Sequence, residues 1–145
     1  MNDVMTNTSP AAPTATTPFM KGADKLGPLD SRYVDVESLP WKPTPCAGIE
    51  MKILVEDPDS GLMTALFRWQ PGAELTLHEH VEVGQTFVLE GSLVDEEGEV
   101  TAGNYVWRPK GNRHTARSPN GALVLSMFLK PNIFLTGENE GRQLR

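Results

Sequence analysis

The chain has 145 residues, enough for one domain with its own hydrophobic core. Its 13 basic and 19 acidic residues give a formal net charge of −6, which argues against a nucleic-acid partner, because proteins that bind nucleic acids usually carry a basic stripe. No apolar run approaches the ~20 residues of a membrane span, so no membrane partner is expected. The N-terminus does not look like a signal peptide, and the single cysteine excludes an internal disulfide. A cytoplasmic protein is therefore expected.

The chain divides into an arm, a β-rich middle and a short tail. Residues 1–30 are expected to form an N-terminal arm or flexible tail, since they are rich in Thr, Pro, Ala and Asn and poor in large apolar residues. Short β-prone segments follow at 49–57, 61–70, 85–95, 103–109, 114–118 and 122–130. Strands this short, with turns about every ten residues and no helical period, predict an all-β sandwich or barrel. This domain is expected over residues 31–135, followed by a C-terminal tail at 136–145.

The three histidines suggest a metal site. His78 and His80 lie one residue apart in the β-prone sequence LTLHEH. Residues i and i+2 of a strand point to the same face, so both imidazoles project together. His114 follows Pro109 and Gly111 in GNYVWRPKGNRH, and this bend can aim its imidazole inward. We predict that the three imidazoles bind one mononuclear metal.

This spacing resembles the two motifs of the cupin superfamily, G-x5-H-x-H-x3/4-E-x6-G and G-x5-P-x-G-x2-H-x3-N. The matching residues are Gly72, His78, His80 and Gly91 in the first motif and Gly103, Pro109, Gly111 and His114 in the second. Within cupins, the chain is most similar to the group that contains ChrR-type anti-sigma-factor cupins and acetylacetone-cleaving dioxygenases. The resemblance implies a single-domain jelly-roll barrel, an antiparallel double sheet with the metal near its mouth.

Two positions depart from the cupin motifs. Gly84 stands where the family has its glutamate ligand, and Ser118 replaces the final asparagine. The resemblance to acetylacetone-cleaving enzymes then implies a site of three histidines, with Gln85 or Glu82 as the alternative source of a fourth ligand. Imidazole suits Zn, Fe, Ni and Cu alike. One divalent metal per chain is expected, with Fe(II) favoured for activity and Zn or Ni as alternatives in the isolated protein.

Candidates for the substrate pocket lie on the predicted strands. Thr86 and Val88 share a face with position 84 by the strand period of two. The aromatic candidates, each of which could equally be barrel core, are Phe67, Trp69, Trp107 and Phe128. Arg108 is expected on a solvated sheet face, and the acidic residues 95–99 at a solvated hairpin tip.

The expected function is an Fe(II)-dependent dioxygenase that cleaves a carbon–carbon bond in a small diketone-like substrate, with dioxygen as the second substrate. One alternative is a non-catalytic zinc-binding cupin that senses a ligand or partner, like the C-terminal half of a ChrR-type anti-sigma factor. Another is a metal-dependent isomerase or hydrolase, which would normally need the carboxylate that Gly84 does not supply. A homodimer is expected because the open sheet edges of a small barrel need covering.

Overall fold

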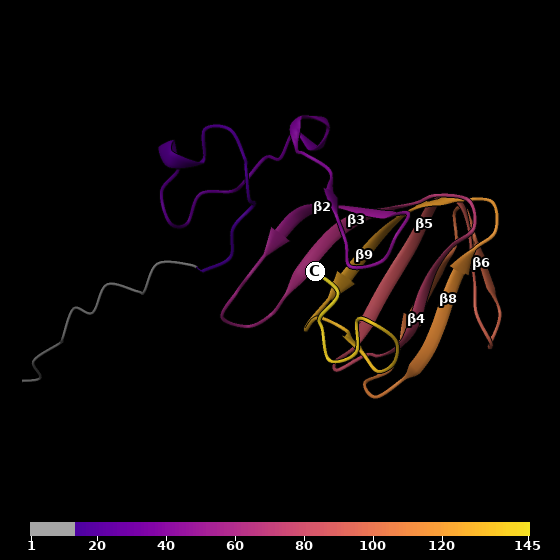
Figure 1. The fold of residues 1–145 in the computed structure, drawn as a ribbon. Helices are drawn as coiled ribbons and strands as arrows, with labels where there is room; N and C mark the ends of the chain where they lie inside the picture. The colour runs from indigo at the N-terminus through magenta and orange to yellow at the C-terminus, as the bar shows by residue number, and fades with distance from the viewer. Residues whose placement is uncertain (1–13) are drawn as a thin grey trace, which may run out of the picture.

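The computed structural model describes residues 14–145, which form ten strands and no α-helix (Figure 1). The strands are β1 (Lys42–Pro43), β2 (Ile49–Glu56), β3 (Met63–Trp69), β4 (Ala73–Glu79), β5 (Gly84–Val94), β6 (Glu99–Thr101), β7 (Tyr105–Arg108), β8 (Arg113–Ser118), β9 (Ala122–Phe128) and β10 (Ile133–Phe134). Two short 3-10 turns, η1 (Ala23–Lys25) and η2 (Val36–Ser38), precede them. Residues 14–145 contain no helix that could span a lipid bilayer.

The strands form one strongly curled antiparallel sheet in the order β1-β2-β3-β9-β5-β8-β4-β10, with β6 and β7 also paired to β5. The long strand β5 joins the two walls of the curl. Its first part pairs with β9 and β7, whereas Ser92–Val94 pair with β6, and Val94 also pairs with Arg117 of β8. The curl brings β4 and β8 to the opposite side from β2 and β3 (Figure 1). The predicted all-β antiparallel fold is confirmed.

The hydrophobic core fills the space between the two walls. β3 and β9 pair over seven positions and bury alternate residues, as the period of two requires. The inward-facing residues of these strands are Met63, Ala65, Phe67, Trp69, Ala122, Val124, Ser126 and Phe128. Each large apolar side chain buried in this way contributes ~1.5–3 kcal/mol. The core therefore fixes the wall that faces the histidines.

Both ends of the described chain pack on the barrel. On the N-terminal side, Thr16 pairs through its backbone with Glu56 at the end of β2. The predicted arm begins in residues 1–13, which lie outside the described residues. On the C-terminal side, residues 136–145 fold back on β10. The Leu144 amide donates to the Asn132 carbonyl at 3.0 Å, and the buried Leu144 side chain turns toward the core.

Candidate metal centre

A β-bulge in β4 turns His78 and His80 into the barrel. Before the bulge, the odd-numbered residues Ala73 and Leu75 are buried. The register between β4 and β8 shifts between Leu75 and His78, and after the shift the even-numbered residues His78 and His80 are buried instead. Bulges re-aim side chains in this manner. Without it, strict alternation would place both imidazoles on the outer face.

The third histidine reaches the same place through strand pairing. His114 lies on β8 directly opposite His78 on β4. The turn before β8 is tied to His80: the His80 amide donates to the Asn112 carbonyl at 2.8 Å, and the Gly111 amide donates to the His80 carbonyl at 2.7 Å. Gly111 has φ +86°, a conformation that glycine adopts without strain. The bend inferred from the sequence therefore aligns His80 with His114.

The three imidazoles present nitrogen atoms that fit one metal ion. One ligand atom from each histidine lies within 4.8 Å of the others. His80 Nε2 and His114 Nε2 are 3.0 Å apart, which is about the separation of two neighbouring nitrogen ligands that each lie ~2.0–2.1 Å from one ion. His78 Nδ1 lies 2.9 Å from the Thr76 carbonyl oxygen. Since a carbonyl only accepts, Nδ1 carries the proton and Nε2 is the free ligand.

The site keeps its imidazoles neutral. Burial lowers the pKa of His78 to about 4, and the neighbouring His114 lowers it further in the same direction. Burial, followed by proximity to His78 and His114, lowers the pKa of His80 to about 3. The pKa of His114 is also lowered, mainly by burial and then by Arg108. Neutral imidazole is the form that binds a metal.

We expect the metal-free protein to lose stability as the pH falls from about 6.5 toward 4. An unfolded histidine takes up a proton near pH ~6.5, whereas His78 and His80 in the folded protein do so only near pH 4 and 3. The unfolded state therefore binds more protons in this window, and acid favours it. Each pKa unit corresponds to ~1.4 kcal/mol, so the total loss should reach several kcal/mol. Urea unfolding of chelator-treated protein measures it, and a flat profile would contradict the buried neutral imidazoles.

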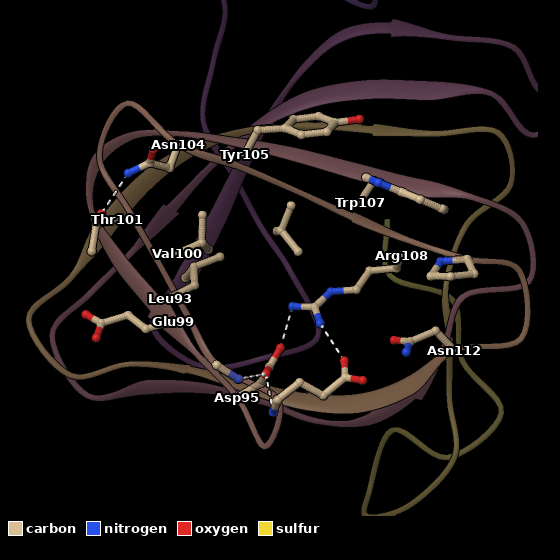
Figure 2. A pocket seen from close by; sticks show the side chains of 14 residues that line it. Leu93, Asp95, Glu99, Val100, Thr101, Asn104, Tyr105, Trp107, Arg108 and Asn112 are labelled. Carbon is tan, nitrogen blue, oxygen red and sulfur yellow. Dashed lines mark hydrogen bonds and ion pairs between the residues drawn. The ribbon is translucent and has the colours of Figure 1, made fainter.

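An ion pair lies beside His114. Asp95 pairs with Arg108, whose Nη1 also donates to Glu97 Oε2 at 3.1 Å (Figure 2). The side chains of Arg108 and Asp95 are only 13% and 5% exposed, which differs from the solvated positions expected from the sequence. Asp95 Oδ2 lies 3.3 Å from His114 Nδ1, a close electrostatic contact without the geometry of a hydrogen bond. Asp95 is thus placed to orient the His114 ring.

Replacing Asp95 with asparagine should weaken metal binding by roughly 10- to 100-fold, the usual cost of losing the partner of a ligating histidine. The loss follows because the negative charge of Asp95, 3.3 Å from His114 Nδ1, attracts a proton on that nitrogen and leaves Nε2 free to bind, and a neutral amide does this less strongly. Competition with a chromophoric chelator measures the affinity. Glu97→Gln is the matched control, because Glu97 pairs with Arg108 from an exposed position. Equal affinity in Asp95→Asn and wild type would exclude the orienting role.

The absence of a side chain at position 84 leaves room for His80. A Cβ atom built on Gly84 would lie 2.3 Å from His80 Nδ1 and 2.7 Å from its Cε1. Contacts this short do not occur between unbonded atoms, so any other residue here would displace the imidazole. Gly84 therefore contributes to the site by leaving room for the His80 imidazole. It stands at the position where the cupin motif has a glutamate ligand.

A mainly apolar cavity extends from the histidines into the barrel. Of the residues predicted for the pocket, those that line this cavity are Phe67, Trp69, Thr86 and Phe128. Val88 is fully buried in the core but lies outside the lining. Trp107 is 57% exposed and borders a separate groove between β6 and β7 (Figure 2).

The alternative fourth ligands point away from the histidines. Gln85 alternates with the inward-facing Gly84 and Thr86, and its Oε1 accepts a hydrogen bond from the hydroxyl of the exposed Tyr105 at 2.6 Å. Glu82 Oε1 lies 3.0 Å from the ammonium group of Lys110. Neither side chain is gathered with the histidines.

Among the cavity-lining residues that were not named as site residues from the sequence are Asp95, Arg108, Asn132 and Leu144. Asn132 and Leu144 lie after the last predicted strand, in a segment whose sequence has no periodic pattern. Their place depends on how the C-terminal residues fold back, so no local sequence signal identifies them.

Comparisons with known proteins agree with this geometry. A family model described as "ChrR Cupin-like domain" matches residues 30–132. The fold is similar to a putative acetylacetone dioxygenase from Methylibium petroleiphilum, with 25% identity and a TM-score of 0.71 over 80% of this chain and 88% of that one. No curated protein sequence matches.

Two more distant structures share the fold. One is an acetylacetone dioxygenase from Acinetobacter johnsonii, at 21% identity and a TM-score of 0.70, covering 79% of this chain and 85% of that one. The other is the anti-sigma factor ChrR of Rhodobacter sphaeroides in complex with SigE, at 21% identity and a TM-score of 0.56. That match covers 64% of this chain and 51% of ChrR. The cupin resemblance drawn from the sequence is confirmed.

Proposed function

This chain belongs to the ChrR cupin-like domain family, and we propose that it is a metal-dependent dioxygenase that cleaves a carbon–carbon bond in a small diketone-like molecule. The observation that carries the proposal is a centre of three buried imidazoles that opens into an apolar cavity. The similarity to a putative acetylacetone dioxygenase over most of both chains supports it.

The ligand set favours a chelating anion as the substrate. His78, His80 and His114 are neutral, so they would hold one divalent ion, Fe(II) in the active protein, without cancelling its charge. Such an ion supplies Lewis-acid and redox chemistry to the ligand beside it. Three protein ligands leave room for a bidentate molecule and dioxygen, and a diketone bound as its enolate carries the complementary negative charge.

The cavity walls suit the carbon skeleton of such a molecule. Phe67 and Phe128 pack edge to face, with ring centroids 6.2 Å apart, and the Phe128 ring lies 6.3 Å from that of His80. The hydroxyls of Thr86 and Ser126 hydrogen bond to each other at 2.8 Å. The walls near the histidines therefore exclude water from the ligand and orient it by shape.

A regulatory zinc-binding cupin is the second candidate, favoured by the family match and by the similarity to ChrR. Oxygen consumption separates the two. Protein loaded with Fe(II) should consume dioxygen when acetylacetone or a related diketone is added, and the His80→Ala variant should not. Tight zinc binding with no oxygen consumption across a panel of diketones would favour the regulatory function and overturn the dioxygenase.

We also propose that the protein is a homodimer. Four large apolar side chains are exposed on the outer face of β5 and β7: Phe87, Leu89, Tyr105 and Trp107. A second copy of the same face would cover these four side chains. Sedimentation of wild type and of Trp107→Glu at micromolar concentration should give a dimer and a monomer, respectively; a monomeric wild type would contradict this.

A further inference from the structure

Asn132 brings a buried amide with an unused hydrogen-bond acceptor to the metal cavity. We propose that its Oδ1 accepts a hydrogen bond from the ligand held at the histidines, and that this ligand is an oxygen-chelating anion with an N–H or O–H group next to its chelating atoms. The inference rests on the proposed function, because it requires a chelating ligand at the three-histidine centre.

The strand register places Asn132 beside the histidines. β10 pairs with β4 so that Phe134 lies opposite His78 and Ile133 opposite Glu79. The next position along this antiparallel ladder puts Asn132 opposite His80. Both residues line the same cavity. A ligand bound to the histidines would therefore lie within the space that the Asn132 side chain borders.

The Asn132 side chain is held in the interior without a protein partner for its oxygen. The residue is 2% exposed, and Oδ1 makes no hydrogen bond to any group in residues 14–145. A buried acceptor left unpaired costs ~1–3 kcal/mol, so its presence in a native fold calls for an explanation, of which a bound ligand is one. A donor on the ligand would recover this cost.

The surrounding structure fixes where the amide lies. The Asn132 carbonyl accepts from the Leu144 amide at 3.0 Å, and Leu144 itself lines the cavity. Phe134, two residues further on, is buried with its ring centroid 6.2 Å from that of His78. Asn132 is therefore held on both sides by residues that contact the same site, which makes it suited to positioning a ligand.

Most other polar groups of the cavity are paired, distant or turned away from the ligand position. His80 Nδ1 and His114 Nδ1 also have no hydrogen-bond partner, but they lie beside Gly84 and Asp95. Thr86 and Ser126 bond to each other, and Asp95 is paired with Arg108. Trp69 Nε1 is also unpartnered, but it is a donor, and Trp69 pairs with Ala122 at the other end of β9 from Phe128. Six strand positions, or ~20 Å, separate Ala122 from Phe128 along β9. An acceptor near the histidines is thus supplied by Asn132, which favours a ligand that has a donor.

Two small chelators test the inference by calorimetric titration of protein loaded with Ni(II) or Zn(II). Acetohydroxamate chelates through two oxygens and carries an N–H beside them, whereas the acetylacetone anion has no such donor. Asn132→Leu should weaken acetohydroxamate binding by about tenfold, the equivalent of one hydrogen bond of ~1.4 kcal/mol, and change acetylacetone binding by less than about twofold. Asn132→Asp keeps an acceptor and should retain the preference for acetohydroxamate relative to acetylacetone.

Asn104→Leu is the control, because Asn104 borders the β6–β7 groove instead of the metal cavity, and its amide donates to the Thr101 hydroxyl at 3.0 Å. Its ratio of affinities should equal that of wild type. Asn132→Ala serves the same comparison if leucine prevents folding. If the Asn132→Leu and Asn132→Ala variants kept the wild-type ratio of acetohydroxamate to acetylacetone affinity, or bound both chelators equally more weakly, the inference would be overturned. The proposed function would not be affected by that result. If neither chelator bound metal-loaded wild type, the proposed function would fail, and the inference with it.

Discussion

The His114→Ala variant is expected to bind no stoichiometric metal after purification. His114 Nε2 lies 3.0 Å from His80 Nε2 at the centre of the site, and its removal leaves two imidazoles and water. The affinity should fall by well over the roughly 100-fold that follows loss of a mere supporting partner. Elemental analysis and a competition titration measure the two quantities.

The neighbouring residue supplies the control for this substitution. Arg113 lies on the same strand with its side chain exposed and paired to Glu79, so Arg113→Ala should keep full metal occupancy. Circular dichroism of both variants shows whether the fold is intact. One equivalent of tightly bound metal in folded His114→Ala protein would disprove the three-histidine site.

Gly84→Ala should also weaken metal binding, although it adds only one methyl group at a position that makes no ligand contact. The new Cβ would overlap His80 Nδ1, and the buried ring can move only by leaving its place beside His114. Overpacking of this kind costs ~1–3 kcal/mol, which corresponds to roughly 5- to 150-fold in affinity. The same competition titration measures the change. Gly98→Ala is the control, since nothing lies within 4 Å of a Cβ at that glycine.

Gly84→Glu separates a space-making glycine from a lost ligand. If Gly84 serves to leave room for the His80 imidazole, a glutamate at this position should displace the ring. Metal binding should then be weaker than in the Gly84→Ala variant. The opposite result, tighter metal than wild type with the fold retained, would mean that the site accommodates a fourth ligand and that Gly84 is a decayed ligand position.

The sequence predicted the fold and the three histidines that the structure gathers, because both depend on local patterns. Short apolar segments between turn residues define the strands, and the spacing from Pro109 to His114 matches a motif. Alternation alone was less reliable: in LTLHEH it predicts that the leucines face inward together and the histidines outward. The bulge after Leu75 reverses this, and a bulge depends on the partner strand as well as on the strand's own sequence.

Residues whose place depends on distant parts of the chain could not be predicted. Asp95 is in an acidic turn that looks solvated, yet pairing with Arg108 from β7 holds it in the interior. Trp107 and Arg108 are neighbours on one strand, and the packing of β7 against β5 decides that the arginine faces inward. Asn132 and Leu144 contact the cavity only because the last residues return along β10.

X-ray absorption at the metal edge of protein loaded with Zn(II) or Fe(II) tests the central claim most directly. If His78, His80 and His114 are the protein ligands, the spectra should fit three imidazole nitrogens at about 2.0–2.1 Å, with the remaining positions filled by water oxygen. Chelation by acetylacetone should then replace water and leave the three imidazoles in place. A first shell with fewer than three imidazoles, or with a protein carboxylate or sulfur ligand, would contradict the account.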